Sequence, residues 1–546
     1  MNGNMLKSGM PRNLMLAVLL VAAVLVVAGA VFLQQRDKSP QTLSAEGIPY
    51  INTDGTVGYQ LNATDIDQAY FALTPYLLDS SGPSEGWYFV KGNITLTNPL
   101  TISGDVHLII GDGFTLTVTR ATNNVIVTSG SLSFYAQSER AMGRIVVTDD
   151  NGISLASGCG LVNTASITSA SPNGHGVHAS GTAAITNGVT GIIRGGSDTI
   201  MLEAGGTVNN LGLITTTGAF AYGIQTLAYA DVTNSGRIQS NYRGILLDAG
   251  GVIENSGTII GTDHGVEVEN HTADITNKAA GTIEGGGGGI SLGRGGTVNN
   301  SGMIRCTDLY SDGIYASNNV MIINSGIIQG TWSGVDLTGG GTVENFGTIR
   351  SADINGNGIA ASGTAVTIFN TGLIQGGACS IRLDAGGAVD NFGRIVSADA
   401  NGNAVEAGHG TAPVTLINTG TITGSVSLPD LANDITFMAG SKIDGDFRMG
   451  TNAGSKLTFA GVLDSSLQYS VIVGNADIGN AVIDIDGTGL PSSLVGGDTV
   501  ILINASAGSV TDPANINISV GVYDFTLSVE DKQLVAMSPP NRVTPR

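Results

Sequence analysis

Apolar and polar residues alternate along most of this chain in a unit that returns every 21 to 27 residues. In residues 295–304, for example, Val298 is followed by Asn300, Gly302 and Ile304, each after one spacer. A repeat with such a period is the signature of a solenoid, in which each unit is one coil. The asparagine of the unit stands at Asn163, Asn187, Asn210, Asn234, Asn255, Asn277, Asn300, Asn324, Asn345, Asn370, Asn391 and Asn418.

Two columns of apolar residues accompany these asparagines. An aliphatic residue lies two positions before each one, and Ile lies four positions after it in ten of the twelve units. These short β-branched segments, bounded by Gly and Asn, favour strands over helices. One unit cannot bury its own apolar face, but stacked units can. The sequence therefore predicts an all-β fold, a right-handed parallel β-helix whose Val and Ile columns are interior ladders.

The asparagine and the glycine of the unit are predicted to form the corner of each coil. Asn tolerates left-handed backbone angles, and its amide can bond to the Asn above and below it. The glycine two residues later suits a tight bend with no room for a Cβ. Units preceded by paired glycines alternate with units that lack them, so the double repeat is 45 or 46 residues long.

An apolar run precedes the repeats. Leu14 to Leu33 is an unbroken apolar stretch of twenty residues, which is enough for a membrane span. Lys7 and Arg12 come before it, which predicts a cytoplasmic amino terminus and export of the rest of the chain. The alternative is a cleaved signal peptide, with Ala28-Gly29-Ala30 as its cleavage site. Both interpretations place most of the chain outside the cytoplasm, as a membrane-anchored or secreted protein.

The sequence divides into five predicted segments. Within the second of them, Thr64 to Leu78 is predicted as a short cap helix, placed where a solenoid must cover its first strands. The segments are a cytoplasmic stub and membrane or signal helix at 1–37, a linker and N-terminal cap at 38–86, asparagine coils at 87–424, C-terminal coils and cap at 425–537, and a disordered tail at 538–546.

The C-terminal coils carry further marks: Ser441-Lys442-Ile443-Asp444-Gly445-Asp446-Phe447, then Gly497-Asp498-Thr499-Val500-Ile501-Leu502-Ile503-Asn504, then Tyr523-Asp524-Phe525-Thr526-Leu527. With the Asn-x-Gly-x-Ile coils, they make residues 87–537 resemble the passenger region of bacterial autotransporters, a right-handed parallel β-helix of the pectin-lyase-like superfold. The resemblance implies a surface or adhesin-like role. The family continues into an outer-membrane β-barrel of many alternating strands. No such segment is found up to residue 546, so we do not expect the resemblance to imply self-export.

Charge and composition narrow the classes of partner. With a net charge of −21 and no Lys/Arg clusters, the chain lacks the phosphate-binding surface of a nucleic-acid-binding protein. It is 42% apolar, which is too high for a disordered glycine-rich linker. Cys159, Cys306 and Cys379 fall in different coils, beyond disulfide reach, and we interpret Cys306 as a small filler.

The candidate catalytic residues are Asp149, Asp150 and His175. Glycoside hydrolysis needs carboxylates close to one sugar, which on a β-helix means residues from adjacent coils. These three residues lie about one period apart and meet that spacing. Aspartate and histidine are also ordinary turn residues, and this second interpretation is favoured.

The candidate metal ligands belong to aspartates that recur once per double repeat. Asp353, Asn355 and Asn357 resemble the first half of a calcium loop, and the segment beginning at Asp399 nearly repeats it. Both lack the closing bidentate Glu, so turn aspartates are the favoured interpretation. His175 and His178 would lie on opposite faces of one strand, so we expect no metal pair there. No cofactor motif is found.

These observations predict an extracytoplasmic, non-catalytic surface or adhesin-like protein that binds a carbohydrate or a protein and contacts the membrane through residues 14–33. The alternative function is a polysaccharide-active, pectinase-like enzyme on the same fold. A third interpretation is a structural spacer. The adhesive role is drawn from the family resemblance, which is a fold-level argument.

Overall fold

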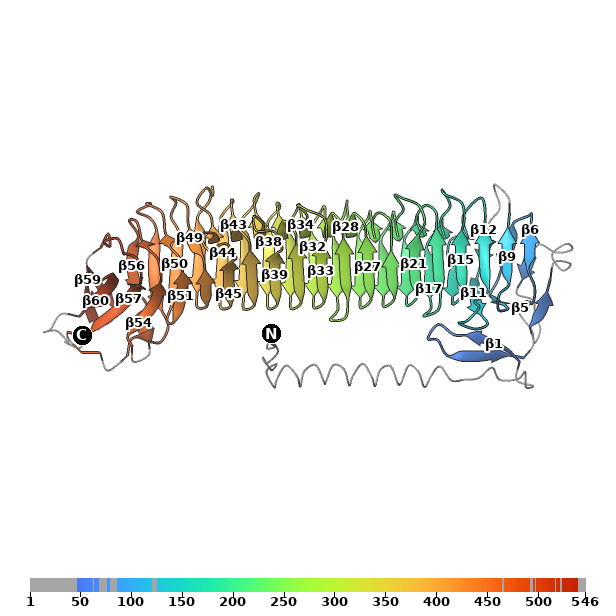
Figure 1. The fold of residues 1–546 in the computed structure, drawn as a ribbon, viewed down its shortest axis with the longest axis horizontal. Coiled ribbons are helices and arrows are strands. Elements are labelled where there is room, and N and C mark those ends of the chain that lie inside the picture. Colours follow the sequence, from blue (N-terminus) through green and yellow to red (C-terminus); the bar gives the residue numbers. More distant parts are fainter. Residues whose placement is uncertain are drawn as a thin grey trace, which may run out of the picture. The chain divides into compact units, whose positions relative to one another are not determined.

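The computed structural model is all-β in the residues that it describes, apart from one turn of 3-10 helix, η1 (Gly487–Gly489). The strands stack into a parallel β-solenoid of the right-handed type with about 17 turns (Figure 1). The predicted solenoid is therefore confirmed. The described residues are 47–61, 63–67, 76–78, 86–119, 125–463, 466–491, 494–495, 497–515, 517–520 and 523–538.

Each coil gives one strand to each of three parallel sheets. In one coil, β32 (Gly296–Asn300) lies in sheet 1, β33 (Met303–Cys306) in sheet 2 and β34 (Asp312–Ala316) in sheet 3. The chain then returns to sheet 1 with β35 (Val320–Asn324), which pairs with β32. Sheet 1 runs from β3 (Thr64–Ile66) to β56 (Val482–Ile485), sheet 2 from β6 (Ile94–Leu96) to β57 (Thr499–Ala505), and sheet 3 from β4 (Tyr76–Leu78) to β55 (Ala476–Asp477).

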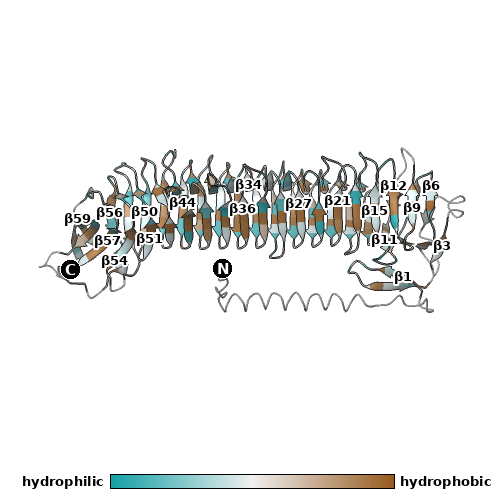
Figure 2. Ribbon diagram, viewed as in Figure 1, coloured by the Kyte–Doolittle hydropathy of each residue, from teal (hydrophilic) through white to brown (hydrophobic). Residues whose placement is uncertain are grey.

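The inward side chains form continuous columns, as predicted. Val298 lies in register between Ile275 and Ile322, and all three are fully buried. Ile304 is buried in the corresponding column of sheet 2. Figure 2 shows apolar positions recurring from strand to strand along the solenoid. Because burying one such side chain contributes about 1.5–3 kcal/mol, these columns supply most of the drive to fold.

The asparagine column is buried as well, and its amides bond to one another along the solenoid. Asn277 Nδ2 donates to Asn300 Oδ1 at 2.9 Å, and Asn300 Nδ2 donates to Asn324 Oδ1 at 2.8 Å. The same bond joins every neighbouring pair from Asn163 to Asn418, at 2.7–2.9 Å. The predicted amide ladder is confirmed.

The predicted left-handed backbone at the asparagine corner is wrong. Each asparagine ends an extended strand, because its amide has to point along the ladder. The glycine two residues later is needed for space instead: a Cβ on Gly302 would lie 2.2 Å from the carbonyl oxygen of Gly281. The non-glycine residues with positive φ in the described part of the chain are Tyr310, Leu467, Asp531 and Lys532.

The predicted cap helix at Thr64 to Leu78 is also wrong in its described residues. Thr64–Ile66 is strand β3, which pairs in parallel with β5 (Trp87–Val90), and Tyr76–Leu78 is strand β4, which pairs with β7 (Leu100–Ser103). Ile66 is fully buried in register with Val90. The open edge of each sheet offers backbone hydrogen bonds and an apolar column, and these outweigh a modest local preference for helix.

The C-terminal end is closed by antiparallel strands. β57 pairs with β60 (Gln533–Met537), which pairs with β59 (Tyr523–Glu530), which in turn pairs with β58 (Asn517–Val520). This meander gives β57, the last parallel strand of sheet 2, an antiparallel partner at its outer edge. Further parallel coils therefore cannot add at that strand.

The expected membrane span at 14–33 lies outside the described residues. In the part of the chain that the structure describes, no helix has the length and hydropathy needed to cross a membrane. The tail from residue 539 also lies outside that part.

The amide ladder can be tested with two adjacent asparagines. Asn300→Ala leaves Asn277 and Asn324 each without one buried hydrogen bond and opens a small cavity, so it should lower the free energy of unfolding by about 2–4 kcal/mol. Asn299 is exposed, so Asn299→Ala should change the free energy of unfolding by no more than about 0.5 kcal/mol. Urea unfolding and hydrogen exchange in the three neighbouring coils measure both variants. Equal losses would contradict a stabilising ladder.

Candidate ligand-binding face

The outer face of sheet 3 gathers charged, aromatic and amide side chains from successive coils. In β34 the buried residues Ile314 and Ala316 face the core, while Tyr315 points outward. The register places Tyr315 beside Asp336 of β37 (Ser333–Leu337). The loops that lead from sheet 2 into sheet 3 form a rim along this face, at the upper edge of Figure 1.

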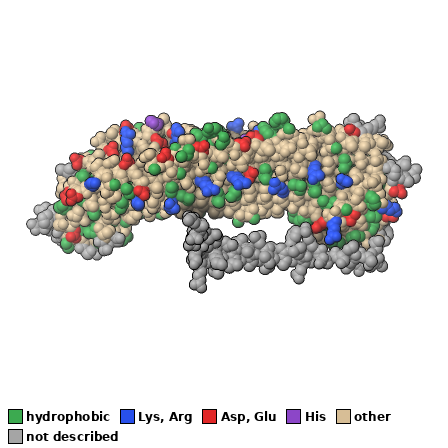
Figure 3. All heavy atoms as spheres, viewed as in Figure 1, with side chains coloured by type: hydrophobic (Ala, Val, Ile, Leu, Met, Phe, Trp, Pro, Cys, Tyr) green, Lys and Arg blue, Asp and Glu red, His purple; other side chains and the backbone are tan. Residues whose placement is uncertain are grey.

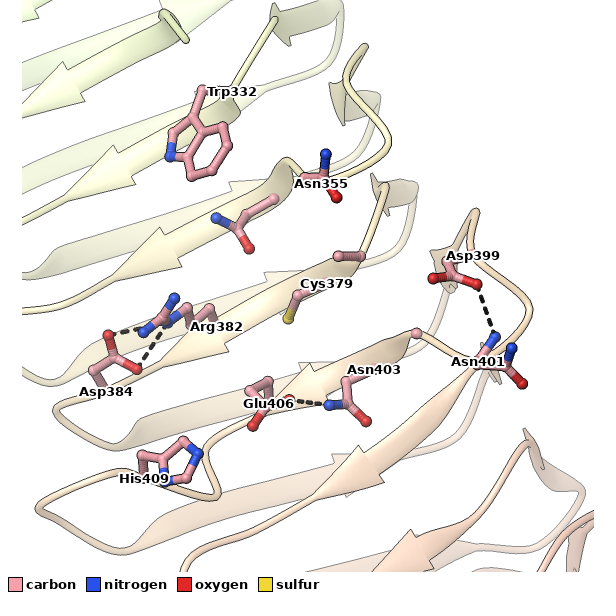
Figure 4. A pocket seen from close by; sticks show the side chains of 13 residues that line it. Trp332, Asn355, Cys379, Arg382, Asp384, Asp399, Asn401, Asn403, Glu406 and His409 are labelled. Atoms are coloured by element: carbon pink, nitrogen blue, oxygen red, sulfur yellow. Dashed lines mark hydrogen bonds and ion pairs between the residues drawn. The ribbon is translucent and has the colours of Figure 1, made fainter.

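A pocket of about 430 Å³ opens on this face, within the range of small-ligand sites (Figure 4). Trp332, in the loop before β37, stands at one end, and Glu406 and His409 stand at the other. Arg382 of β43 (Cys379–Leu383) lies between them. The full lining is Trp332, Asn355, Asn357, Ala378, Cys379, Arg382, Asp384, Asp399, Asn401, Gly402, Asn403, Glu406 and His409.

Several polar side chains in the pocket are held by hydrogen bonds to their neighbours. Arg382 Nε donates to Asp384 Oδ1 at 2.9 Å and to Oδ2 at 3.1 Å, and this bond raises the pKa of Arg382. The Nδ2 of Asn403 donates to Glu406 Oε2. Arg382 keeps half of its side chain exposed. Such a set presents oriented donors and acceptors to a ligand rich in hydroxyl groups.

Cys379 is an unsuitable nucleophile although it lines the pocket. Burial raises the pKa of its thiol to about 12, and the charge of Glu406 adds to this. The thiol is neutral at physiological pH, and the thiolate is the reactive species. Cys159 and Cys306 are also buried and free, which agrees with the interpretation of Cys306 as a filler.

The structure brings three of the four calcium candidates to this pocket. Asn355, Asn357 and Asp399 line it, whereas Asp353 does not. The carboxylates act in turns: Asp353 Oδ1 accepts from the backbone N–H of Asn355 at 2.7 Å, and Asp399 Oδ1 accepts from that of Asn401 at 3.0 Å. These bonds are those of Asx-turns, in which the aspartate orders its own loop.

The catalytic candidates lie in a separate cluster, seven to eight coils from Trp332 at the near end of the pocket. Asp149 is exposed and accepts a hydrogen bond from the hydroxyl of Thr148. Asp150 lies near His175, and its negative charge favours the protonated form of that histidine. The His175 Nδ1 lies 3.5 Å from Asp198 Oδ2. The sequence reasoning named Asp150 and His175 but missed Asp198, which comes from the next coil and is almost fully buried.

The expectation that His175 and His178 lie on opposite faces is wrong. Their rings stack with centroids 5.4 Å apart. His175 precedes strand β16 (Val177–Ala179), so the alternation within a strand does not apply to it. The Nε2 of His178 lies 3.0 Å from Glu203 Oε1. Burial lowers the pKa of His175, and His178 adds to the effect.

A third cluster surrounds Arg243. Its Nε lies 2.5 Å from Glu267 Oε2 and 3.4 Å from Asp263 Oδ2, and its Nη1 lies 3.1 Å from Glu269 Oε1. Ligand-type atoms of Asp263, His264 and Glu267 lie within 4.8 Å of one another. The guanidinium of Arg243 supplies the positive charge against these carboxylates. Asp263 belongs to the aspartates that recur once per double repeat, with Asp353 and Asp399, and the sequence pattern indicated no other member of this cluster.

Two aspartates on adjacent rungs form the last group. The Oδ1 of Asp312 accepts from the backbone N–H of Ser333 at 2.9 Å. Burial raises the pKa of Asp312, and it raises that of Asp336 to about 6, with the charge of Asp312 as the second cause. A raised carboxyl pKa next to a second carboxyl is the pattern of an acid–base pair.

Carboxylates greatly outnumber cations on this face. Between residues 150 and 409, the cations in the strands of sheet 3 and in the rim are Arg243 and Arg382. Arg294 lies in a turn that follows a strand of sheet 3. The carboxylates are Asp150, Asp198, Glu203, Asp248, Asp263, Glu267, Glu269, Asp308, Asp312, Asp336, Asp353, Asp384, Asp399 and Glu406. The face therefore repels polyanions.

Comparison of the chain with protein-family models, with curated proteins and with solved structures finds no match.

The buried carboxyl of Asp198 predicts a pH-dependent effect on stability. Burial raises its pKa from 3.8 to about 6, so ionisation is harder in the folded state. The resulting loss of stability is absent below about pH 4 and complete above about pH 7. Asp198→Asn should therefore stabilise the protein by about 2–3 kcal/mol near pH 8 and have little effect near pH 4.

Thermal unfolding of the Asp198→Asn variant across this pH range measures the effect. Asp149→Asn is the matched control, because Asp149 is an exposed carboxylate of the same region. It should change the free energy of unfolding by no more than about 0.5 kcal/mol. A constant difference for Asp198→Asn would contradict the raised pKa.

Proposed function

We propose that this protein is an extracytoplasmic, non-catalytic β-solenoid, similar to an autotransporter passenger, that binds a surface carbohydrate on the outer face of sheet 3. The observation that carries the proposal is the pocket between Trp332 and Glu406. The membrane anchor at 14–33 and the position outside the cytoplasm belong to the same proposal, and their support is the sequence pattern alone.

The chemistry of the pocket suits a sugar. An aromatic ring offers a large apolar surface against which the C–H face of a pyranose can pack. Trp332 supplies such a ring at one end of the pocket. The amides Asn355, Asn357 and Asn401 and the ion pair of Arg382 supply donors and acceptors in several directions. Sugar hydroxyls, which both donate and accept, can satisfy such a mixed set.

The charge of the face narrows the class of sugar. Asp384, Asp399 and Glu406 stand in the pocket against the single cation Arg382, within the described lining. A uronic-acid polymer such as pectin would bring its own carboxylates close to these groups, and like charges oppose binding. We therefore infer a neutral or amino-sugar polysaccharide as the ligand.

Tryptophan fluorescence can test the site, because the chain holds two tryptophans, Trp87 and Trp332. In a Trp87→Phe variant, Trp332 becomes the sole reporter, and titration with neutral or amino-sugar polysaccharides should change its emission. Trp332→Ala should weaken binding at least tenfold by calorimetry, about 1.4 kcal/mol. Trp87 packs against His107 and Tyr135, away from the pocket, so Trp87→Phe should bind as the wild type does.

Two outcomes would contradict this site. The first is equal affinity of the wild type and the Trp332→Ala variant for every polysaccharide that binds. The second is tight binding of polygalacturonate, which would show that the acidic face does not select its ligand.

A second candidate function is polysaccharide hydrolysis, favoured by Asp312 and Asp336. They come from the adjacent strands β34 and β37, and the pKa of Asp336 is raised to about 6, chiefly by burial and then by the charge of Asp312. The acidic surroundings again argue against a pectin-like substrate. This function would use a neutral polymer and water, with one residue as acid and the other as base.

We expect the purified protein to release no reducing ends from neutral polysaccharides that it binds. Asp336→Asn should leave polysaccharide binding unchanged, as should Asp149→Asn and Asp150→Asn, which serve as controls from the distant cluster. A reducing-end assay measures the reaction. Release of reducing ends by the wild type, lost in Asp336→Asn and kept in Asp150→Asn, would establish the enzyme and overturn the non-catalytic proposal.

A further inference from the structure

The outer face of sheet 2 carries the opposite charge to sheet 3. Its strands from β18 (Ile192–Gly195) to β48 (Thr421–Thr423) are all described, and within them Glu284 is the sole outward carboxylate. Figure 3 shows Lys and Arg side chains in a row along the middle of this face. The outward cations are Arg194, Arg237, Arg305, Arg350 and Arg394. On a chain with a net charge of −21, this is a marked segregation.

Most of these guanidinium groups keep an uncompensated charge. Arg305 pairs with Glu284, with Nη2 2.5 Å from Oε2. Arg237 and Arg350 donate to neutral glutamine side chains at 3.0 and 2.9 Å. Arg194 and Arg394 form no ion pair with any residue that the structure describes.

Half-buried apolar side chains run beside the arginines. They occupy the first outward position of the sheet 2 strands, at Ile192, Leu213, Met303, Ile327 and Leu373. Phe346 and Phe392 stand in the turns from sheet 1 to sheet 2 and are 48% and 51% exposed. Arginine, methionine and aromatic residues are the types enriched in protein interfaces. An anionic polysaccharide would match the arginines but leave the apolar column without a partner.

The outer face of sheet 1 has the complementary character. From β17 (Ala183–Asn187) to β50 (Asp434–Met438), the outward positions of these described strands hold carboxylates and no cation. Lys278, in a turn, pairs with Glu254 at 2.6 Å. The outward carboxylates are Asp231, Glu254, Asp274, Glu344, Asp390 and Asp434, and the large apolar residues among them are Val252, Met321, Ile323, Phe369 and Ile417.

The charges on the two faces share a spacing. Arg305, Arg350 and Arg394 recur on every second coil, and Glu344 and Asp390 are also two coils apart. Two coils correspond to about 10 Å, because neighbouring strands lie about 4.8 Å apart. Two solenoids that lie side by side, parallel or antiparallel, could therefore place arginines of one molecule opposite carboxylates of the other.

We propose that sheet 2 of one molecule docks side by side on sheet 1 of a second copy, which leaves sheet 3 and its pocket uncovered. Ten rungs of sheet 2, each about 13 Å wide, offer roughly 600 Å² on each partner, at the low end for a specific interface. The association is therefore weak and depends on concentration. The two faces differ, so the contact is heterologous and joins copies into a row.

The net negative charge of each copy opposes this contact only over short range. At physiological salt the Debye length is about 8 Å, so the charges that face each other directly dominate. Low salt strengthens attraction between opposed faces, and high salt weakens it. This dependence separates an electrostatic contact from a purely apolar one.

Sedimentation of the full chain over a concentration series tests the proposal. At about 50 mM salt the wild type should form species larger than a monomer, which dissociate at about 500 mM. Arg305→Glu with Arg350→Glu should weaken association at least tenfold, and so should Glu344→Arg with Asp390→Arg. An equimolar mixture of the two double variants should associate again, because each then offers the face that the other needs.

Arg305→Lys with Arg350→Lys is the matched control, since it keeps the charge and should still associate. Unchanged thermal unfolding of each variant excludes misfolding as the cause. A wild type that stays monomeric at every concentration and at both salt levels would overturn the proposal. So would unaltered association of the charge-reversed variants, or a monomer that binds heparin, the polyanion probe, through the same arginines.

Discussion

The amide hydrogen bond between successive asparagines is the interaction on which the solenoid depends. Apolar columns drive the coils together, but an aliphatic ladder tolerates small displacements along the strands. A buried amide does not, because its donor and acceptor must both find partners in the low-dielectric interior. A slip of one residue would turn Asn300 outward and bury Asn299 in its place, without a ladder to join. The ladder therefore fixes the register of sheet 1, and the short turn after it fixes that of sheet 2.

That register decides what the outer surface of the molecule can do. Trp332 and His409 are separated by more than three coils of sequence, yet they line one pocket because each coil returns to the same place. The same repetition collects arginines on sheet 2 and carboxylates on sheets 1 and 3. Three faces with different chemistry thus come from one repeat, since each outward position can vary while the inward positions stay fixed.

The sequence was informative where one residue type recurs in step with the coil. It predicted the solenoid, the buried Val298 and Ile304 columns, and the amide ladder. It failed at Thr64 to Leu78, where a sheet edge overrides local preference, and at His175, which lies outside the strand that holds His178. The pocket was predicted only in part. The recurring segments that begin at Asp353 and Asp399 indicated Asn355, Asn357 and Asp399, but the other pocket residues are of different types in each coil, so the period gives no signal for them. Reading the residue between the two buried positions of each sheet 3 strand would have found Asp336, Arg382 and Glu406.

The three corners of the coil differ in how much chain they can hold. Two residues link sheet 1 to sheet 2 after ten of the twelve asparagines, whereas the link from sheet 2 to sheet 3 ranges from two residues at Thr262–Asp263 to seven at Thr217–Gly223. Lengthening a loop costs little entropy, because the closure term rises only with the logarithm of its length. The stacked strands are thus fixed, whereas the loops from sheet 2 to sheet 3 can change in length, and these loops border the pocket. New recognition loops could be grafted there, or arise by insertion, while the frame that presents them stays the same.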